Sequence, residues 1–423
     1  MKNIYKTQQK INFIIFCLVV LGLRLPPFYL LPVRNALVTS HSLARFLLIL
    51  LFVFTGWLLY EKKLFFKIDR KLAMMLSFFF FTQSISILSA VNISSFILIY
   101  KDVIAGILIF ILSMIILDSS EKINMVIRVL LVTIIIGILY NIIVYFFPEF
   151  FLSFSKYILY DKYLEMMEIN IKRHRFFSDV YDAGLIPLLF YYFYSYKRNL
   201  VRIFFFLAIG LISFNSFLSN FRGQLLIVFL AFISCHVLFL RKVKASLFQL
   251  VFIIFFLYVG YIASNSFLGS NLVDRFMLST KEDVHSIKSR LWWSEISFEM
   301  VLSSPILGVG LGNFYDNLSF SDRPKKLYND WRQKLSEISA MHPHNILSGT
   351  LAETGFLGLL SQLILIGYFL KSDIKFIKKK LTMNLSIIIC FWLIFLFSFI
   401  NPQYTFSYLG LFWLLRGLVY KTM

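Results

Sequence analysis

The sequence predicts an all-α, polytopic integral membrane protein with about twelve transmembrane helices and one large loop on the side away from the cytoplasm. Of its 423 residues, 59% are hydrophobic and only 15% are charged. A water-soluble domain has no use for so much apolar sequence. Apolar stretches near the ~20-residue length that spans a bilayer recur along the whole chain. The bilayer is therefore the expected solvent for most of the protein.

The predicted spans follow one another through short connections, except at 148–178 and 269–344. They cover residues 11–31, 43–60, 72–90, 97–117, 126–147, 179–196, 203–219, 223–240, 248–268, 345–370, 383–400 and 403–420. We expect the first to be an uncleaved helix, because Arg24-Leu25-Pro26-Pro27 follows it in place of a small-residue cleavage site.

Basic residues in the short loops orient the chain. If the N-terminus is cytoplasmic, these loops and the C-terminus are all cytoplasmic, as the positive-inside rule requires. The loops contain Lys62, Lys63, Lys67, Arg70 and Lys71; Lys122 and Arg128; Lys197, Arg198 and Arg202; Arg241, Lys242 and Lys244; Lys371, Lys375 and Lys378 to Lys380; and Lys421. The same pattern argues that the net charge of +20 does not indicate nucleic-acid binding, because no basic stripe lies on a soluble domain.

The outer connections also carry basic residues, which the positive-inside rule does not explain. The longest of them, 269–344, is polar enough to fold outside the membrane. Its apolar residues from Val284 to Val301 recur at helical spacing, which predicts an amphipathic helix lying over the bilayer and ended by a turn at Pro305. The apolar set consists of Ile287, Leu291, Ile296, Met300 and Val301.

A histidine motif precedes the tenth predicted span. His342-Pro343-His344-Asn345 is followed nine residues later by Gly355, and then by Gly358. An imidazole at the outer mouth of a helix suits a general base that accepts the proton of a hydroxyl nucleophile, and His344 is the candidate. The alternative is an interfacial turn, with Gly355 and Gly358 as helix-packing notches.

Three arginines are candidates for binding an anion. Arg222 lies in a connection too short to carry it into bulk water, so it either meets an anion or snorkels to the interface. Arg290 lies on the predicted amphipathic helix beside two tryptophans, which would anchor it at headgroup depth. Arg175 belongs to a basic cluster that is either an anion clamp or a solvated face. The guanidinium fork suits bidentate contact with phosphate.

Other chemistries find little support in the sequence. The glycine run 308–312 resembles a phosphate-binding fingerprint, but no strand precedes it. Cys17, Cys235 and Cys390 all lie in apolar spans and are expected to be small buried hydrophobes. We find no metal-ligand cluster and no Asp-x-Asp motif, so we expect neither a metal nor a cofactor. Lys101 and Asp102 stay unassigned.

These motifs together resemble those of the O-antigen ligase family over about residues 205–370. The resemblance rests on four features: Arg222-x3-Leu226, Arg290-Leu-Trp, the stretch 305–314 and His344-Asn345-x9-Gly355-x2-Gly358. The resemblance divides the chain into N-terminal helices, 1–204, and a ligase-related region, 205–423, that includes a periplasmic loop at 269–344. One departure is Arg175-Phe176-Phe177, where such proteins commonly have an arginine followed by Gly-Phe or Gly-Thr.

The resemblance implies a membrane glycosyltransferase of the GT-C type in the bacterial inner membrane, active in lipopolysaccharide biosynthesis. Its donor would be an undecaprenyl-diphosphate-linked glycan and its acceptor lipid A-core, both at the periplasmic face. Arg222 and Arg290, with Arg175, would hold the diphosphate without a metal ion, and His344 would be the base. Related polymerases join repeat units instead. A flippase for the same lipid-linked glycan is the alternative of another class, although we find no matching halves.

Overall fold

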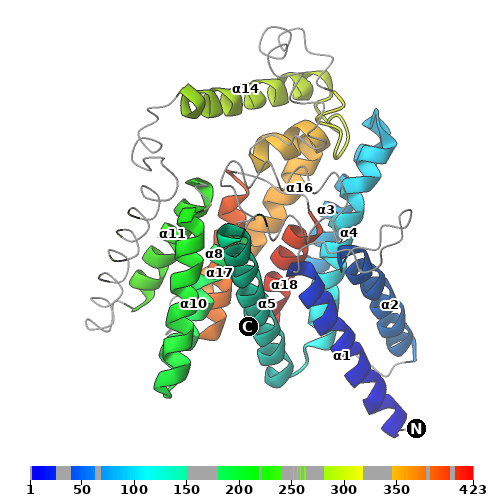
Figure 1. Cartoon of the computed structure of the whole chain (residues 1–423). Helices are drawn as coiled ribbons and strands as arrows, with labels where there is room; N and C mark the ends of the chain where they lie inside the picture. The colour runs from blue at the N-terminus through cyan, green and yellow to red at the C-terminus, as the bar shows by residue number, and fades with distance from the viewer. Residues whose placement is uncertain are drawn as a thin grey trace.

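The computed structural model describes residues 2–24, 40–61, 68–147, 149, 180–218, 222–239, 281–317, 345–377, 382–400 and 405–422, with four single positions between 251 and 262. Across these ranges the regular elements are thirteen α-helices and one short 3-10 helix, η1, which confirms the all-α class (Figure 1). The helices are α1 (Lys2–Arg24), α2 (Ser40–Tyr60), α3 (Arg70–Ile85), η1 (Ser86–Ser89), α4 (Ile93–Ile116), α5 (Ser120–Phe146), α8 (Val180–Gly184), α9 (Ile186–Ser195), α10 (Asn199–Leu218), α11 (Arg222–Phe239), α14 (Lys281–Ser303), α16 (Ile346–Ile377), α17 (Met383–Phe397) and α18 (Phe406–Thr422).

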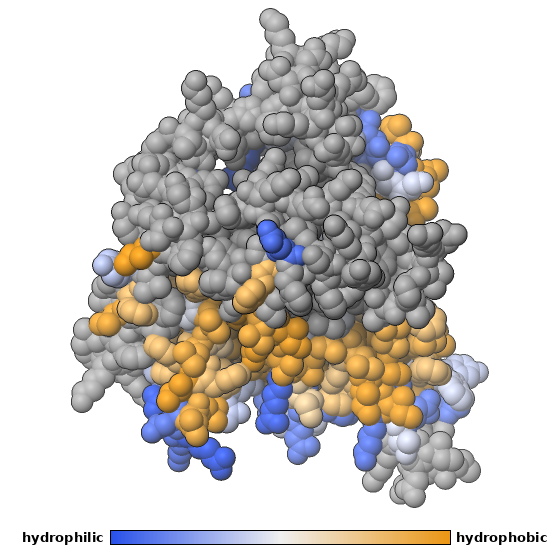
Figure 2. Space-filling model, viewed as in Figure 1, coloured by the Kyte–Doolittle hydropathy of each residue, from blue (hydrophilic) through white to orange (hydrophobic). Residues whose placement is uncertain are grey.

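The protein is a multi-pass membrane protein. Within the described ranges, six helical segments are long and apolar enough to cross a bilayer. They are His41–Tyr60, Arg70–Ser89, Ile93–Ile116, Ser120–Leu139, Asn199–Ser216 and Ile346–Phe376. Three shorter apolar helices accompany them, at Thr7–Leu23, Arg222–Val237 and Met383–Phe397. Figure 2 shows a hydrophobic band across the lower part of the visible face, with hydrophilic residues gathered along its lower edge. The total of twelve spans stays a prediction.

Two predicted spans differ in detail from the helices that form. The stretch 179–196 divides into α8 and α9, and Leu185 lies between them. Pro187 in the first turn of α9 has no N–H to continue the preceding helix, which accounts for the break. The stretch 345–370 becomes the longer α16, which is kinked at Gly355 with φ 65° and ψ −167°.

The core lies among α4, α16, α17 and α18, and large aromatic side chains dominate it. The ring of Phe369 packs against two others, with its centroid 6.0 Å from that of Phe391 and 6.4 Å from that of Trp413. Cys235 and Cys390 are buried and Cys17 is partly buried, and all three are free thiols. The prediction of small buried hydrophobes is confirmed for Cys235 and Cys390.

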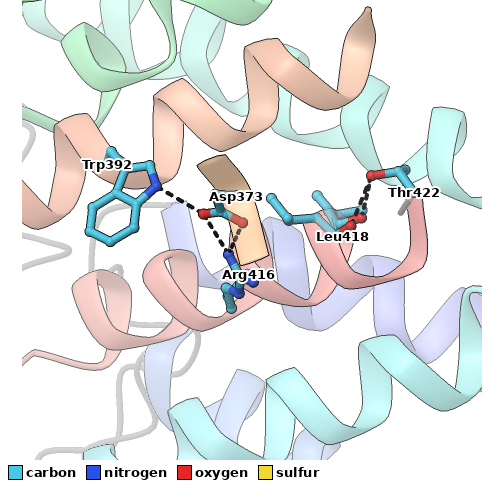
Figure 3. Close-up of polar contacts among 6 residues, drawn as sticks. Asp373, Trp392, Arg416, Leu418 and Thr422 are labelled. Atoms are coloured by element: carbon cyan, nitrogen blue, oxygen red, sulfur yellow. Dashed lines mark hydrogen bonds and ion pairs between the residues drawn. The ribbon is translucent and has the colours of Figure 1, made fainter. Parts of the chain in front are cut away.

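An ion pair is enclosed in this aromatic core (Figure 3). Arg416 of α18 donates from Nη1 to both carboxylate oxygens of Asp373 of α16, each at 2.8 Å. The indole N–H of Trp392 on α17 donates to the same carboxylate at 2.8 Å. Both charged side chains are essentially inaccessible to solvent, and the guanidinium lies 4.1 Å from the Phe369 ring centroid. The pair therefore joins the C-terminal half of α16 to α17 and α18.

Candidate functional site

Helix α14 lies across the upper end of the bundle and packs on α16 (Figure 1). It confirms the helix predicted over residues 284–301. Its buried face contains Trp293, Ile296, Met300 and Val301, and the Trp293 ring centroid lies 5.9 Å from that of Phe314. Leu291 of the predicted apolar set does not join this buried face and is 62% exposed. The prediction was wrong for Trp293, which packs inside the protein and does not anchor the helix at headgroup depth.

The glycine run that follows α14 is held against the kink in α16. The N–H of Val309 donates to the carbonyl of Ala352 at 2.9 Å, and the N–H of Gly310 donates to that of Glu353 at 2.9 Å. Beyond the kink, the N–H of Phe356 donates to the carbonyl of Pro305 at 2.8 Å. These bonds satisfy backbone groups that the kink in α16 would otherwise leave unpaired. The glycine run and the kinked part of α16 are therefore held in place against each other.

Positive φ angles at four glycines make this contact possible. Gly308, Gly310 and Gly312 have φ of 69°, 97° and 74°, and Gly355 has 65°. A Cβ on Gly355 would collide with the backbone carbonyl of Ile306. Only glycine combines this backbone conformation with so close an approach. The glycines of the run thus allow two segments of the chain to pack closely together. This packing explains why the run resembles a phosphate-binding fingerprint.

The opposite side of the run is attached to the α3–α4 corner. The N–H of Leu311 donates to Oγ of Ser86 in η1 at 3.3 Å, and the N–H of Asn92 donates to Oδ1 of Asn313 at 2.6 Å. The side chain of Asn92 also caps α4 by accepting from Ser94 and Ser95. The run therefore ties α14 to η1 and α4 as well as to α16.

Arg222 and Arg290 come from distant parts of the chain and influence each other electrostatically. Arg222 is the first residue of α11, Arg290 lies on α14, and both are partly buried. Burial, and then the positive charge of Arg222, lower the pKa of Arg290 from its usual range. Two guanidinium groups in one half-buried region repel each other, and such an arrangement is characteristic of a site for an anion.

Asn345 caps the N-terminus of α16. Its Oδ1 accepts from the N–H of Leu347 at 2.8 Å, which satisfies one of the free donors of the first turn. The N–H of Ile346 donates to the carbonyl of Ser398 at 3.0 Å. The start of α16 is therefore fixed to the end of α17. His344 and His342, directly before this cap, lie outside the described residues, as does Arg175.

Gly355 and Gly358 have distinct structural roles. Gly355 forms the kink, whereas Gly358 leaves room for the side chain of Thr354, which donates to the carbonyl of Thr350 at 2.7 Å. A Cβ at Gly358 would collide with Thr354 Oγ1. The two glycines thus shape α16 below its cap, and neither forms the notch for a neighbouring helix that the packing alternative expected.

Two buried ion pairs escaped the sequence-based search. Arg45 of α2 pairs with Asp102 of α4, with Nη2 to Oδ1 at 2.8 Å, so the charge left unassigned at position 102 has a partner. The second pair is Asp373–Arg416. A single arginine inside an apolar span was the available signal for Arg416, since such charges are costly in a bilayer and require a partner.

Chemically, the arrangement offers cations and helix N-termini to a ligand with negative charge. α11 starts at Arg222 and α16 starts just after Asn345, so the positive end of each helix dipole lies at these residues. Arg290 reaches the region from α14, which the glycine run fixes in place. The parts come from three separate segments, and each is positioned by contacts of its own.

Comparison with known proteins assigns this part of the chain. The comparison with curated proteins gave no match. The family described as O-antigen ligase matches residues 203–363, which closely reproduces the interval predicted from the motifs. The matched interval contains α10, α11, α14, the glycine run and the capped, kinked start of α16. The chain therefore carries, at residues 203–363, a domain of the O-antigen ligase family.

Proposed function

We propose that the protein is an O-antigen ligase, which transfers a glycan from undecaprenyl diphosphate to lipid A-core at the periplasmic face of the bacterial inner membrane. The observation that carries the proposal is the match of the O-antigen ligase family to residues 203–363, which contain Arg222 and Arg290, both partly buried. The diphosphate of the lipid donor is the anion proposed to lie against these two cations. The family match to the same segment supports this choice of ligand.

In the proposed reaction, a hydroxyl oxygen of the acceptor sugar attacks the anomeric carbon of the donor. The bond from that carbon to the diphosphate oxygen breaks, and its electron pair leaves with the diphosphate. Arg222 and Arg290, with Arg175 as a further candidate, stabilise the negative charge that develops on the leaving group. His344 accepts the proton of the attacking hydroxyl. The donor's own bond supplies the energy, so the step needs neither ATP nor an ion gradient.

Asn345 supports this chemistry through the backbone. It caps α16, and the backbone bond from Ile346 to Ser398 fixes the start of that helix relative to α17. A base must lie within hydrogen-bond reach of the proton it accepts, which makes such positioning essential. Gly355 and Gly358 contribute by shaping the helix that follows. His342 is kept as a supporting residue.

The proposal is tested with purified protein, a lipid-diphosphate glycan and lipid A-core. Arg222→Ala, Arg290→Ala and His344→Ala should each lower transfer by about 100-fold or more, as expected when transition-state stabilisation or a general base is lost. Arg198→Ala is the matched control, because Arg198 is exposed in the connection before α10. Full transfer by all three variants, in preparations that remain folded by size-exclusion chromatography, would contradict the proposed site.

The two alternatives give different outcomes in a deletion strain. If the protein is a ligase, its deletion leaves polymer on the lipid carrier and lipid A-core without long glycan. If it is a polymerase, its deletion leaves lipid A-core capped by a single repeat unit. A flippase moves the lipid-linked glycan across the membrane without joining sugars, so purified protein would form no new glycosidic bond. Transfer that continues in the presence of a chelator is expected, because cations of the chain replace a metal ion.

A further inference from the structure

A polar cluster joins the first turns of α2 and α18 to α4. We call His41, Arg45, Asp102 and Ser407 the second cluster. Arg45 contacts Asp102 through both Nε and Nη2, at 2.9 and 2.8 Å. His41 Nε2 lies 3.2 Å from Ser407 Oγ. The ring of Phe406 lies between the two pairs, 4.7 Å from the Arg45 guanidinium carbon and 5.9 Å from the His41 ring centroid.

The second cluster lies at the end of the bundle where α16 begins. The N–H of Ile346 binds the carbonyl of Ser398 near the end of α17, and only residues 401–404 separate Ile400 from the start of the α18 segment at Thr405. α17 packs on α11, which carries Arg222, and also on α18, which carries Ser407. In Figure 1, α11 and α2 stand on opposite sides of the bundle, with α17 and α18 between them. The start of α16 is thereby linked through α17 both to α11 and to α18.

Helix packing alone is a poor explanation for these side chains. An ion pair between apolar helices often costs as much desolvation as it returns, so an apolar pair could join the helices equally well. The Arg45 side chain stays 26% exposed, whereas that of Asp102 is 8% exposed. Lys101, next to Asp102, is exposed. The pair is thus buried on one side and accessible on the other.

The side-chain types match those that bind saccharides. A carboxylate accepts hydrogen bonds from sugar hydroxyls, guanidinium and hydroxyl groups donate to sugar oxygens, and an aromatic ring supplies the apolar surface. The proposed reaction has two substrates, and its diphosphate donor is assigned to Arg222 and Arg290. The second substrate must present a sugar hydroxyl from another direction. The second cluster offers groups of these types on the α2 side of the bundle, opposite α11.

We propose that the second cluster binds the saccharide end of the acceptor, with Asp102 and Arg45 contacting its hydroxyl groups. This inference rests on the proposed function. The same chemistry serves lipid A-core, the acceptor of a ligase, and a second lipid-linked repeat unit, the acceptor of a polymerase.

The test varies the acceptor concentration at saturating donor, with lipid A-core in one arm and a lipid-linked repeat unit in the other. In the productive arm, Asp102→Asn and Arg45→Met should raise the acceptor KM at least 10-fold, while the donor KM stays within 2-fold of the wild type. Ser407→Ala should raise the acceptor KM about 3-fold, because it removes one hydrogen bond. Asp118→Asn and Lys122→Met are matched controls from the ion pair at the other end of α4, whose Nζ–Oδ1 distance is 2.9 Å.

An acceptor KM within 2-fold of the wild type in folded Asp102→Asn and Arg45→Met overturns the inference. If these two do not fold, unchanged acceptor KM values in Ser407→Ala and His41→Gln overturn it instead. If the wild type transfers glycan to neither acceptor, the proposed function is contradicted, whereas the inference about the second cluster is not yet decided by that result. The second cluster is then tested by binding of core oligosaccharide without donor: loss of binding in Asp102→Asn supports it, and equal binding to the wild type and the variant overturns it.

Discussion

The arginines at positions 222 and 290 differ from lysines in shape rather than in charge. Arg222→Lys and Arg290→Lys keep the cation but lose the planar fork that binds two phosphate oxygens at once. We expect each variant to raise the donor KM by roughly tenfold, since one charge-assisted hydrogen bond is lost. The measurement is the steady-state rate against donor concentration. A donor KM equal to that of the wild type in both variants would show that bidentate contact is absent.

Gly355 allows a second residue-scale prediction. Gly355→Ala places a Cβ at positive φ and against the Ile306 carbonyl, so we expect the free energy of unfolding to fall by about 1–3 kcal/mol. The matched control is Gly367→Ala in the same helix, where nothing lies within 4 Å and the change should stay within about 1 kcal/mol. Thermal unfolding in detergent compares the two. Equal melting temperatures would mean that the kink is not constrained.

At the scale of elements, the Asp373–Arg416 pair determines how α16 is attached to α18. Arg416→Met leaves a buried carboxylate without its counter-charge, which should lower the free energy of unfolding by about 3–5 kcal/mol. The double variant Asp373→Leu/Arg416→Met removes both charges and should lie near the wild type. Equilibrium unfolding of Asp373→Leu, Arg416→Met and the double variant gives the coupling energy between the two side chains. A double variant as unstable as Arg416→Met would refute this account.

Helix α14 depends on its inner face to hold Arg290 in place. Trp293→Ala should destabilise the packing against Phe314 and Ala352 by about 3–5 kcal/mol of local free energy and reduce transfer, because Arg290 lies one turn away. Leu291→Ala, two residues earlier and exposed, should change transfer little. Transfer assays and protease sensitivity of α14 measure both effects. Equal losses in the two variants would contradict the observed orientation of the helix.

At the scale of the whole molecule, the proposed orientation can be tested with introduced cysteines. The native thiols are buried or partly buried, so background labelling by a membrane-impermeant maleimide should be low. Ser303→Cys, at the end of α14, should react in cells with a permeabilised outer membrane. Ser120→Cys, at the start of α5, should react only after the inner membrane is opened. Reaction of both under the first condition would contradict the orientation.

Patterns among neighbouring residues in the sequence predicted the family, the all-helical class and most helix positions. Apolar length predicted the spans, and the spacing of residues 284–301 predicted α14, because both depend on neighbours along the chain. The breaks at Leu185 and Gly355 were missed, although Pro187 and the glycine gave signs of them. Burial of Trp293 instead of Leu291 could not be inferred, because it depends on how α14 docks on α16.

Pairings between distant segments were beyond single-sequence reasoning. Asp102 was noticed as a charge in an apolar span, but Arg45 lies on another helix, and their contact follows only from the packing of α2 on α4. Arg222 and Arg290 were grouped by chemistry and family motif, and the structure brings their charges within mutual influence. The predicted base, His344, stays a prediction.

The attachment of the glycine run to α16 also bears on how such a protein can change over evolutionary time. The chain leaves this frame at Asn317, whose side chain donates to the carbonyl of Asn313 at 2.8 Å, and re-enters it at the cap formed by Asn345. The contacts named at both anchor points join described residues on either side of this interval. Changes of length or sequence in residues 318–341, which leave His342 and the proposed base His344 untouched, should therefore be compatible with the positions of Arg290 and the start of α16.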